Sequence, residues 1–483
     1  MPTDRPNVIL IVADDLDAAS FDAMPFVSDL FRRQGATFAN AYVTTPICGP
    51  SRASLLRGQY AHNHGMLRNN GDRGGFHTFH LEGREESTLA TWLQAASYRT
   101  ALVGKYLNGY PRLPRRITDR TLPESWTPPD WDEWYAQMDR GALGGPSFRL
   151  NENGNIVTYP ESPENYTTDV LARHATGFVE RAAGADDPFF LYVATLVPHY
   201  PAIPAPRHAA AFADAALPRP PSFDEADVSD KPTHVRASQR LTGKQIAAIE
   251  EHHRDRLRSL LSLDELVAGL VAALTTAGAL DHTTIVFTSD HGWHQGEHRI
   301  PLGKETPYEE SIRVPLAAIG PGIPRGRAID ALALNIDLAP TIADLAGAET
   351  PSFVDGRSLV PLLRGEPIPN WRRAFLVEHR GMDKARVYPG IGEAMPVADY
   401  QALRTGPGAG NLLYAEYETG EREIYALDAD PYERHNLAAS LPPATLAPLS
   451  ARLDDLRRCA GETCRAAEDA PLAGITPTSP HSA

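Results

Sequence analysis

The chain has 483 residues, 42% hydrophobic and 22% charged, which is close to the average of soluble globular proteins and argues against a largely disordered chain. Its length predicts one large domain with a smaller one. The net charge of −15 argues against nucleic-acid binding, and no apolar run approaches the roughly 20 residues of a membrane-spanning helix, so neither nucleic acid nor membrane is an expected partner.

Short apolar runs, rich in β-branched residues, predict strands that are buried on both faces. These runs are residues 7–12, 100–104, 189–196, 283–289 and 314–320. Helical patterns lie between them, at residues 88–96, 169–182 and 257–274. Strands that alternate with helices predict an α/β fold, in which a large, mixed and mostly parallel central sheet carries helices on both faces.

The composition and the hydrophobic pattern of the sequence change along the chain and suggest two domains. Residues 110–163 and 202–232 are rich in Pro with Trp, Gly or Ala, and we predict that they are long surface excursions. After residue 368, the segments 373–379, 411–418 and 422–428 resemble short antiparallel strands, and 444–458 a helix. We therefore predict a catalytic α/β domain over 1–368, a small C-terminal α+β subdomain with an antiparallel sheet over 369–464, and a disordered tail over 465–483.

The chain has only three cysteines, too few for a disulfide framework. Cys459 and Cys464 could pair across a turn at Gly461 or remain free thiols at a helix end. A pair would favour a secreted or periplasmic protein with a trimmed N-terminus. The N-terminus as written has no signal peptide and predicts a cytoplasmic protein, so the two observations conflict and both locations stay open.

Polar side chains follow four of the predicted strands. They are Asp14 and Asp15, then Lys105, then His199, and finally Asp290 with His291. Each alone has an ordinary explanation, such as a helix cap, a solvated lysine or a structural histidine. Because ligands of open α/β sheets bind at the carboxyl ends of the strands, their joint occurrence predicts one functional site.

The chemistry of these side chains predicts a cation and an anion in the same pocket. Asp14, Asp15 and Asp290 would repel one another unless a cation neutralises them. Carboxylate oxygens suit Ca²⁺ or Mg²⁺, and the nitrogen of His291 leaves Mn²⁺ open. Lys105 and Lys304 could then hold an anionic oxygen, and His199 could serve as a general acid. A pocket with these groups suits a small anionic ester.

Cys48 opens the segment "CGPSR", in front of a predicted helix that Gly58 ends. Taken alone, it could be a packed thiol, a metal ligand or a nucleophile. The segment resembles the sulfatase signature Cys-x-Pro-x-Arg, and the aspartate pair, "VGKY", "PHYP", "TSDHG" and Lys304 occur in the order of that family. The resemblance runs from about residue 7 to 437. The segments "SRASLLRGQYAHNHG" and "GKYLNGYP" are most similar to the branch of N-acetylglucosamine-6-sulfatases and heparan 6-O-endosulfatases.

The resemblance implies an alkaline-phosphatase-like fold and hydrolysis of a sulfate monoester, with a sugar of the glucosamine 6-sulfate type as the expected substrate. It also implies one divalent cation, Ca²⁺ before Mg²⁺ or Mn²⁺, and conversion of Cys48 to Cα-formylglycine by a formylglycine-generating enzyme. The implied metal ligands are Asp14, Asp15, Cys48, Asp290 and His291. The implied catalytic residues are Cys48, Arg52, Lys105, His199 and Lys304.

The sequence departs from the family pattern at two positions. Many sulfatases have a histidine where this chain has Leu107, so we expect Asn108, His64 or Asn69 to contact the substrate instead. Many have Asp-Asn where this chain has Asp290-His291, a form that also occurs in phosphonate monoester hydrolases. A phosphonate monoester or phosphodiester hydrolase is therefore the alternative enzyme, and an anion-binding protein with unmodified Cys48 is the alternative without catalysis.

Aromatic residues near these motifs leave a sugar subsite open. The candidates are Trp126, Trp131, Trp134, Trp293 and His298. Packing within the loops is the more ordinary role of such residues, and we expect it for most of them.

Overall fold

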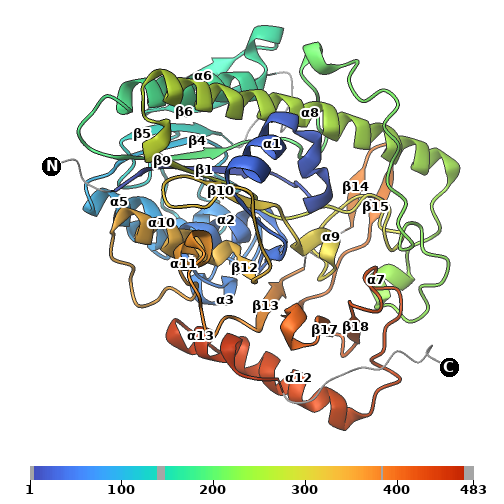
Figure 1. Cartoon of the computed structure of the whole chain (residues 1–483). Coiled ribbons are helices and arrows are strands. Elements are labelled where there is room, and N and C mark those ends of the chain that lie inside the picture. Colours follow the sequence, from blue (N-terminus) through green and yellow to red (C-terminus); the bar gives the residue numbers. More distant parts are fainter. Residues whose placement is uncertain (1–4, 139–146, 382–384, 473–483) are drawn as a thin grey trace.

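The computed structural model describes residues 5–138, 147–381 and 385–472. Its main sheet has the strand order β11-β2-β10-β9-β1-β8-β4-β5-β6-β7 (Figure 1). The four central strands are β9 (Thr283–Ser289), β1 (Asn7–Ala13), β8 (Phe189–Ala194) and β4 (Arg99–Gly104). They run parallel to their neighbours, whereas β10 (Leu316–Ile319) pairs with β9 in the antiparallel sense. The predicted mixed, mostly parallel sheet is confirmed.

Strand β1 shows why these runs form central strands. Its residues are apolar on both faces, so alternate side chains enter two different cores. Val8, Leu10 and Val12 pack in one core with helices α2 (Cys48–Arg57), α5 (Leu89–Ala95) and α10 (Leu338–Ala346). Ile9 and Ile11 pack in the other core with α1 (Pro25–Gln34), α6 (Thr167–Ala182) and α8 (Gly243–Thr276).

The segment 110–163 is not only a surface excursion, and that prediction is wrong for part of its length. It contributes β5 (Glu133–Gln137), β6 (Phe148–Glu152) and β7 (Asn155–Tyr159) to one edge of the main sheet. β5 is parallel to β4, and β6 and β7 are antiparallel to their neighbours. These strands are short and lie among Pro and Gly residues, so pairing with β4 rather than local propensity decides their structure.

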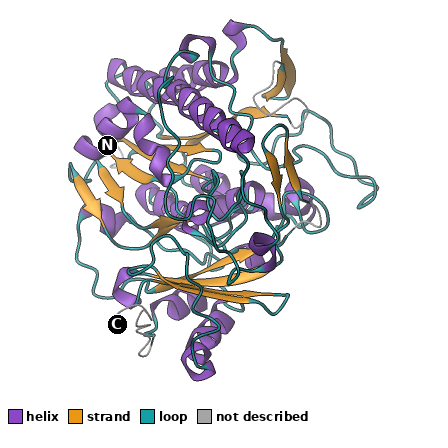
Figure 2. Cartoon of the chain, turned by 90° about the vertical axis from the view of Figure 1, so that its right-hand side faces the viewer, coloured by secondary structure: helices purple, strands orange, loops and turns teal. Residues whose placement is uncertain are grey.

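The C-terminal region forms a second sheet, of order β13-β16-β17-β18, which Figure 2 shows as a separate layer near the bottom of the view. Its strands are β13 (Ala374–His379), β16 (Tyr400–Thr405), β17 (Leu412–Tyr417) and β18 (Arg422–Ala426). All neighbouring pairs are antiparallel, as predicted, although the sequence did not indicate β16. Helices α12 (Pro443–Leu456) and α13 (Glu462–Asp469) follow, and Cys459 and Cys464 form a disulfide between them.

The predicted disordered tail begins too early. Residues 465–469 belong to α13, and Glu468 within it is fully buried. Its carboxylate accepts hydrogen bonds from the Tyr60 hydroxyl and from Arg357 and Arg372. Arg372 also pairs with Asp337, so this helix is tied to the catalytic domain by a buried ion network. Residues 473–483 lie outside the described part of the chain.

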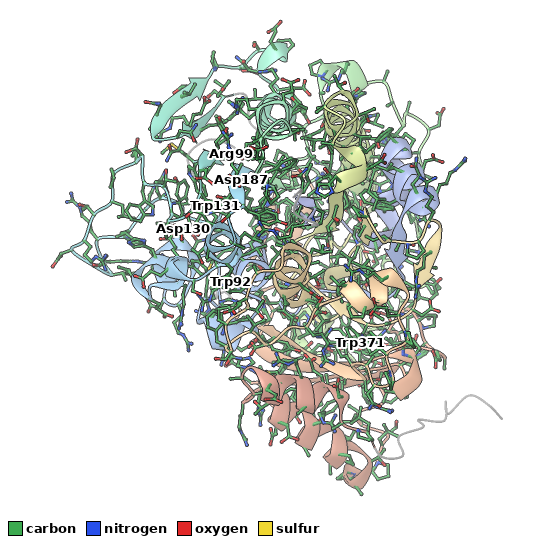
Figure 3. The ribbon with its side chains drawn as sticks, turned by 60° about the vertical axis from the view of Figure 1, so that its left-hand side comes forward. Trp92, Arg99, Asp130, Trp131, Asp187 and Trp371 are labelled. Atoms are coloured by element: carbon green, nitrogen blue, oxygen red, sulfur yellow. A yellow bond between two sulfur atoms is a disulfide. The ribbon has the colours of Figure 1, made fainter. Side chains whose placement is uncertain are left out.

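The tryptophans near the motifs have packing roles. Trp131 and Trp134 are almost fully buried, and Trp126 packs against the same core. Figure 3 shows Trp131 near Arg99, which begins β4. Trp131 therefore lies at the amino end of the strands, whereas the predicted site follows their carboxyl ends. Trp293 belongs to a small core cluster with Tyr388. Among the described helices, none combines the length and the apolar character needed to cross a bilayer.

The buried network of α13 predicts a large effect of Glu468→Ala on stability. The substitution leaves the guanidinium groups of Arg357 and Arg372 without this carboxylate, and we expect the free energy of unfolding to fall by about 3–5 kcal/mol in denaturant titrations. The matched control is Asp469→Ala, because the side chain of Asp469 is 34% exposed and its pair with Arg357 should contribute only about 1 kcal/mol. Equal effects of the two substitutions would contradict the assigned burial of α13.

Candidate active site at the carboxyl ends of the central strands

Four neighbouring strands deliver the polar residues to one place. Because β9, β1, β8 and β4 lie side by side and parallel, their carboxyl ends meet at the same edge of the sheet. Asp14 and Asp15 follow β1, Asp290 and His291 follow β9, and Lys105 follows β4. All five are buried, and His199, in the loop after β8, keeps 15% of its side chain exposed.

Helix α2 brings Cys48 to the same edge. Cys48 is the first residue of α2, and Gly58 ends the helix with a left-handed φ of 64°. The Gly49 amide donates to Asn69 Oδ1 at 2.7 Å, and the Ser51 hydroxyl donates to the Asp290 carbonyl. A Cβ on Gly49 would lie 2.5 Å from the terminal methyl of Met66 and 2.9 Å from Asn69 Oδ1, so a larger residue would require these side chains to shift.

Three buried carboxylates are each paired with a buried cation. Lys105 Nζ donates to Asp14 Oδ2 at 2.5 Å, and Lys304 Nζ donates to Asp15 Oδ1 at 2.6 Å. Arg52 Nε donates to Asp290 Oδ2 at 2.9 Å. These side chains come from five separate segments of the chain, so the site exists only in the folded protein.

The Cys48 sulfur lies at the centre of this group. It is 3.0 Å from Lys304 Nζ, 3.3 Å from His291 Nε2 and 3.7 Å from Asp14 Oδ1. Burial opposes ionisation of the thiol, but the charges of Lys105, Lys304 and His291 outweigh it and hold the pKa of Cys48 well below its ordinary value. The site therefore stabilises negative charge at the side-chain position of Cys48.

The two adjacent aspartates have opposite pKa shifts. Burial, together with the charge of Asp290, raises the pKa of Asp14 to about 6 despite Lys105. Burial also acts on Asp15, but Lys304 and the two histidines outweigh it, and the pKa of Asp15 lies below its usual value. For His199, the charges of Asp15 and Asp14 outweigh burial and raise the pKa, which favours the protonated imidazolium.

The donor set fits a divalent cation. The ligand atoms of Asp14, Cys48, Asp290 and His291 lie within 4.8 Å of one another, as do those of Asp14, Asp15, Cys48 and His199. Asp15 Oδ2 is buried without a hydrogen-bond partner. A cation bound by these oxygens would neutralise the aspartates and leave Lys105 and Lys304 free to attract an anion.

The three predicted substrate contacts differ in burial and in their hydrogen bonds. His64 is fully buried, its Nε2 is 3.0 Å from the Ser54 hydroxyl, and its Nδ1 accepts the Met66 amide at 3.2 Å. It supports α2, so its prediction as a substrate contact is wrong. Asn69 Oδ1 holds the start of α2 through the Gly49 amide, and its contact with the substrate stays a prediction. Asn108 is partly exposed, and its buried Oδ1 has no partner.

No motif in the sequence indicates the residues that the C-terminal subdomain brings to this site. The hairpin of β14 (Arg386–Tyr388) and β15 (Gly392–Ala394) carries Arg386, which donates to Glu305 Oε1 at 2.8 Å, one residue from Lys304. Burial opposes the charge of Arg386, but Glu305, Cys48 and Asp15 are among the groups that raise its pKa. The buried Tyr388 hydroxyl and both ring nitrogens of His379 have no hydrogen-bond partner.

Fold and site together define a hydrolase with an alkaline-phosphatase-like fold, and comparisons with known proteins identify its family. The sequence model of the family described as "Sulfatase" matches residues 6–348. The model described as "N-sulphoglucosamine sulphohydrolase, C-terminal" matches residues 296–458. The chain belongs to the sulfatase family and is a sulfuric ester hydrolase of the EC 3.1.6 type. The resemblance predicted from the motifs is confirmed.

Similar proteins include relatives of nearly full length. The N-acetylglucosamine-6-sulfatase of Homo sapiens is 33% identical, covering 96% of this chain and 86% of the relative. An arylsulfatase of Volvox carteri is 34% identical over 95% of this chain and 76% of its own. A structure solved in complex with its substrate D-glucosamine-2-N,6-O-disulfate has a TM-score of 0.74 and 25% identity, covering 97% of this chain and 99% of the other.

A phosphonate monoester hydrolase of Silicibacter pomeroyi shares the fold. Its TM-score is 0.70 at 24% identity, and the match covers 92% of this chain and 93% of the hydrolase. This likeness concerns the fold alone and does not distinguish between sulfate and phosphonate esters.

The buried position of His64 predicts that His64→Ala affects stability rather than substrate affinity. The substitution removes the partner of the Ser54 hydroxyl and leaves a cavity, so we expect a loss of about 2–4 kcal/mol in the free energy of unfolding. KM should stay within about twofold, because the side chain does not reach the substrate. A large rise in KM at unchanged stability would instead support substrate contact. Asn108→Ala provides the comparison, with a raised KM and little loss of stability.

Proposed function

We propose that the protein hydrolyses a sulfate monoester of a sugar, of the glucosamine 6-sulfate type, with a formylglycine made from Cys48 as its nucleophile. The observation that carries this proposal is the position of Cys48 at the start of α2, within 3.7 Å of a lysine, a histidine and an aspartate. The similarity to N-acetylglucosamine-6-sulfatases supports the choice of sugar. A formylglycine-generating enzyme is the partner that this maturation requires.

The proposed reaction uses both hydroxyls of the hydrated aldehyde. One hydroxyl oxygen attacks the ester sulfur, the bond between sulfur and the sugar oxygen breaks, and that oxygen leaves with a proton. The second hydroxyl then loses its proton and forms the carbonyl as the carbon–oxygen bond to sulfate breaks. Sulfate leaves and the aldehyde is restored. An unmodified thiol has no second hydroxyl, so it could not complete this cycle.

The chain's own residues have distinct roles in this proposal. Arg52, oriented by Asp290, holds one hydroxyl of the nucleophile. Lys105 and Lys304 stabilise the charge on the sulfuryl oxygens. His199, the most exposed of the group and favoured in its protonated form, donates the proton to the leaving oxygen.

The proposed cation is held by Asp14, Asp15, Asp290 and His291 together with the side chain at position 48. When bound, it supplies Lewis acidity that lowers the pKa of the nucleophile. The oxygen-rich donor set favours Ca²⁺, with Mg²⁺ or Mn²⁺ as the alternatives. The Cys459–Cys464 disulfide supports a secreted or periplasmic location, in which such a bond persists, over a cytoplasmic one.

The β14–β15 hairpin supports recognition of a sugar. Tyr200, next to His199, and Tyr388 pack edge to face with ring centroids 5.2 Å apart. Tyr200 is partly exposed, and the Tyr388 hydroxyl has no partner. The partly exposed ring of Tyr200, which Tyr388 supports, suits a sugar ring, because a sugar ring has an apolar face and a hydroxyl edge. Arg386 adds N–H donors for oxygen atoms of the sugar.

The mass of the peptide that contains Cys48 tests the nucleophile. We expect protein from its native host to have lost one sulfur and two hydrogens and gained one oxygen at this residue. We expect the protein to hydrolyse N-acetylglucosamine 6-sulfate and an aryl sulfate, and to hydrolyse an aryl phosphonate monoester or a phosphate diester much more slowly. Cys48→Ala should lower kcat by at least about 10³-fold. A free thiol in fully active native protein would contradict the nucleophile, and turnover of the phosphonate alone would contradict the substrate class.

Arg386 gives a separate test of substrate recognition. Because Arg386 is expected to contact the bound substrate rather than the reacting bond, Arg386→Ala should raise KM for the sulfated sugar by about 10-fold or more. KM for a small aryl sulfate should change little, and Arg386→Lys should restore part of the affinity. An equal rise in KM for both substrates would mean that Arg386 acts in catalysis or positions Glu305, rather than binding the sugar.

A further inference from the structure

A second group of ligand-type side chains lies outside the proposed active site. It consists of His298, in the long loop after β9, Glu310, in α9 (Glu309–Ile312), and Glu433, in the loop after β18. One ligand atom from each lies within 4.8 Å of the other two. Figure 1 shows α9 next to the region where the C-terminal sheet meets the catalytic domain. The three residues therefore join segments that are far apart in the chain.

Each of the three side chains has a buried atom with no hydrogen-bond partner. These atoms are His298 Nε2, Glu310 Oε2 and Glu433 Oε1. His298 is fully buried and Glu433 is 1% exposed. Unpaired buried polar atoms are rare and costly, so three of them in one cluster require an explanation. The cost disappears if all three bind the same ion.

Hydrogen bonds fix the orientation of two of these ligands and leave their other atoms free. His298 Nδ1 is 3.0 Å from Glu225 Oε2, so Nε2 is the nitrogen available to the cluster. Glu433 Oε2 accepts the Glu309 amide at 3.1 Å, so Oε1 is the free oxygen. A histidine that donates one ring N–H to a carboxylate and offers the other nitrogen is the usual arrangement of a metal-bound imidazole.

Two carboxylates and an imidazole lie together in this cluster. Buried carboxylates close to one another repel unless a cation accompanies them. The nearby Arg404 is already bound to Glu309 at 2.8 Å.

One residue of the cluster borders a cavity. Glu310 lines a cavity of about 850 Å³, together with Glu297, Glu309, Pro431 and Tyr432, whereas His298 and Glu433 are not among its lining residues. The unpaired atoms of all three side chains are buried, so an ion would have to enter by side-chain movement at Glu310.

We propose that His298, Glu310 and Glu433 form a second divalent-metal site, which binds Zn²⁺. One imidazole nitrogen and two carboxylate oxygens, with a fourth position open to water, form a ligand set that Zn²⁺ accepts readily. Ligand atoms on a tetrahedral zinc ion lie about 3.4 Å apart, so atoms that are within 4.8 Å of one another would have to approach by side-chain rotation. The site differs from the proposed active site, which is richer in oxygen ligands.

An ion bound at such a site would connect two separate parts of the protein. His298 belongs to the same loop as Lys304, and Glu433 belongs to the C-terminal subdomain. An ion bound between them would fix this loop, and with it Lys304, against the subdomain that carries Arg386. This role is structural and does not depend on the ester that the enzyme cleaves.

The test measures zinc binding in a background without the thiolate and one carboxylate of the active site. Full-length protein with Cys48→Ala and Asp290→Asn is stripped of metal and titrated with Zn²⁺, and bound metal and Tm are measured. We expect about one Zn²⁺ per chain and a rise in Tm on binding. Adding Glu433→Gln or His298→Ala should abolish both. The matched control is Glu309→Gln, because Glu309 is adjacent to the cluster but pairs with Arg404, and binding should persist.

Two further outcomes decide the proposal if a variant folds poorly. Co²⁺ bound to the background protein should give visible d–d absorption that Zn²⁺ removes, a signal that needs no substitution in the cluster. In the metal-free state, Glu310→Gln should leave Tm unchanged or raise it, because it removes a buried acid, while eliminating the rise caused by Zn²⁺. Failure of the background protein to bind Zn²⁺ or Co²⁺, or equal binding by the Glu433→Gln variant, would overturn the proposal whatever the enzyme's substrate.

Discussion

The structure depends on the parallel alignment of β9, β1, β8 and β4, because this alignment forces three buried carboxylates to share one edge of the sheet. Like charges in a buried position are unfavourable unless cations accompany them. The chain supplies three such cations from three other segments, Arg52 on α2, Lys105 after β4 and Lys304 in the loop after β9. The one-to-one pairing accounts for the burial of all six groups and for their proximity to Cys48.

The C-terminal subdomain contributes to both the stability and the proposed recognition of substrate. Its helix α13 is bound to the catalytic domain through Glu468, Arg372 and Asp337, a buried network that is costly to interrupt. Its β14–β15 hairpin then places Arg386 beside Glu305. A subdomain held rigidly against the strand ends can offer specific contacts to a sugar, whereas the catalytic domain alone offers groups for the ester.

The loop after β9 connects two clusters of unlike chemistry. Asp290 and Lys304, towards the two ends of the loop, belong to an oxygen-rich group with its own cations, which suits a hard ion and an anionic ester. His298 lies between them in sequence and belongs to a group with two glutamates, Glu310 and Glu433. The same loop therefore carries residues for catalysis and residues whose proposed role is to hold that loop in place.

The sequence by itself determined the central strands, the order of the polar residues that follow them and the sulfatase signature around Cys48, because continuous apolar runs and short motifs are local properties. It also allowed the active-site group to be assembled, since parallel strands must bring their carboxyl ends together. It did not predict β5–β7, whose structure depends on pairing with β4, nor the helix at residues 465–469, whose polar composition resembles a solvated tail although Glu468 is buried.

Only the tertiary structure showed that His64 and Asn69 bond to residues of α2. It alone brought Arg386 to the active site and joined His298, Glu310 and Glu433 into one cluster. These contacts link residues separated by tens to hundreds of positions, and no periodicity or motif encodes them. The physical reason is that the burial and the unpaired atoms of a side chain are fixed by packing between distant segments, which the local sequence does not specify.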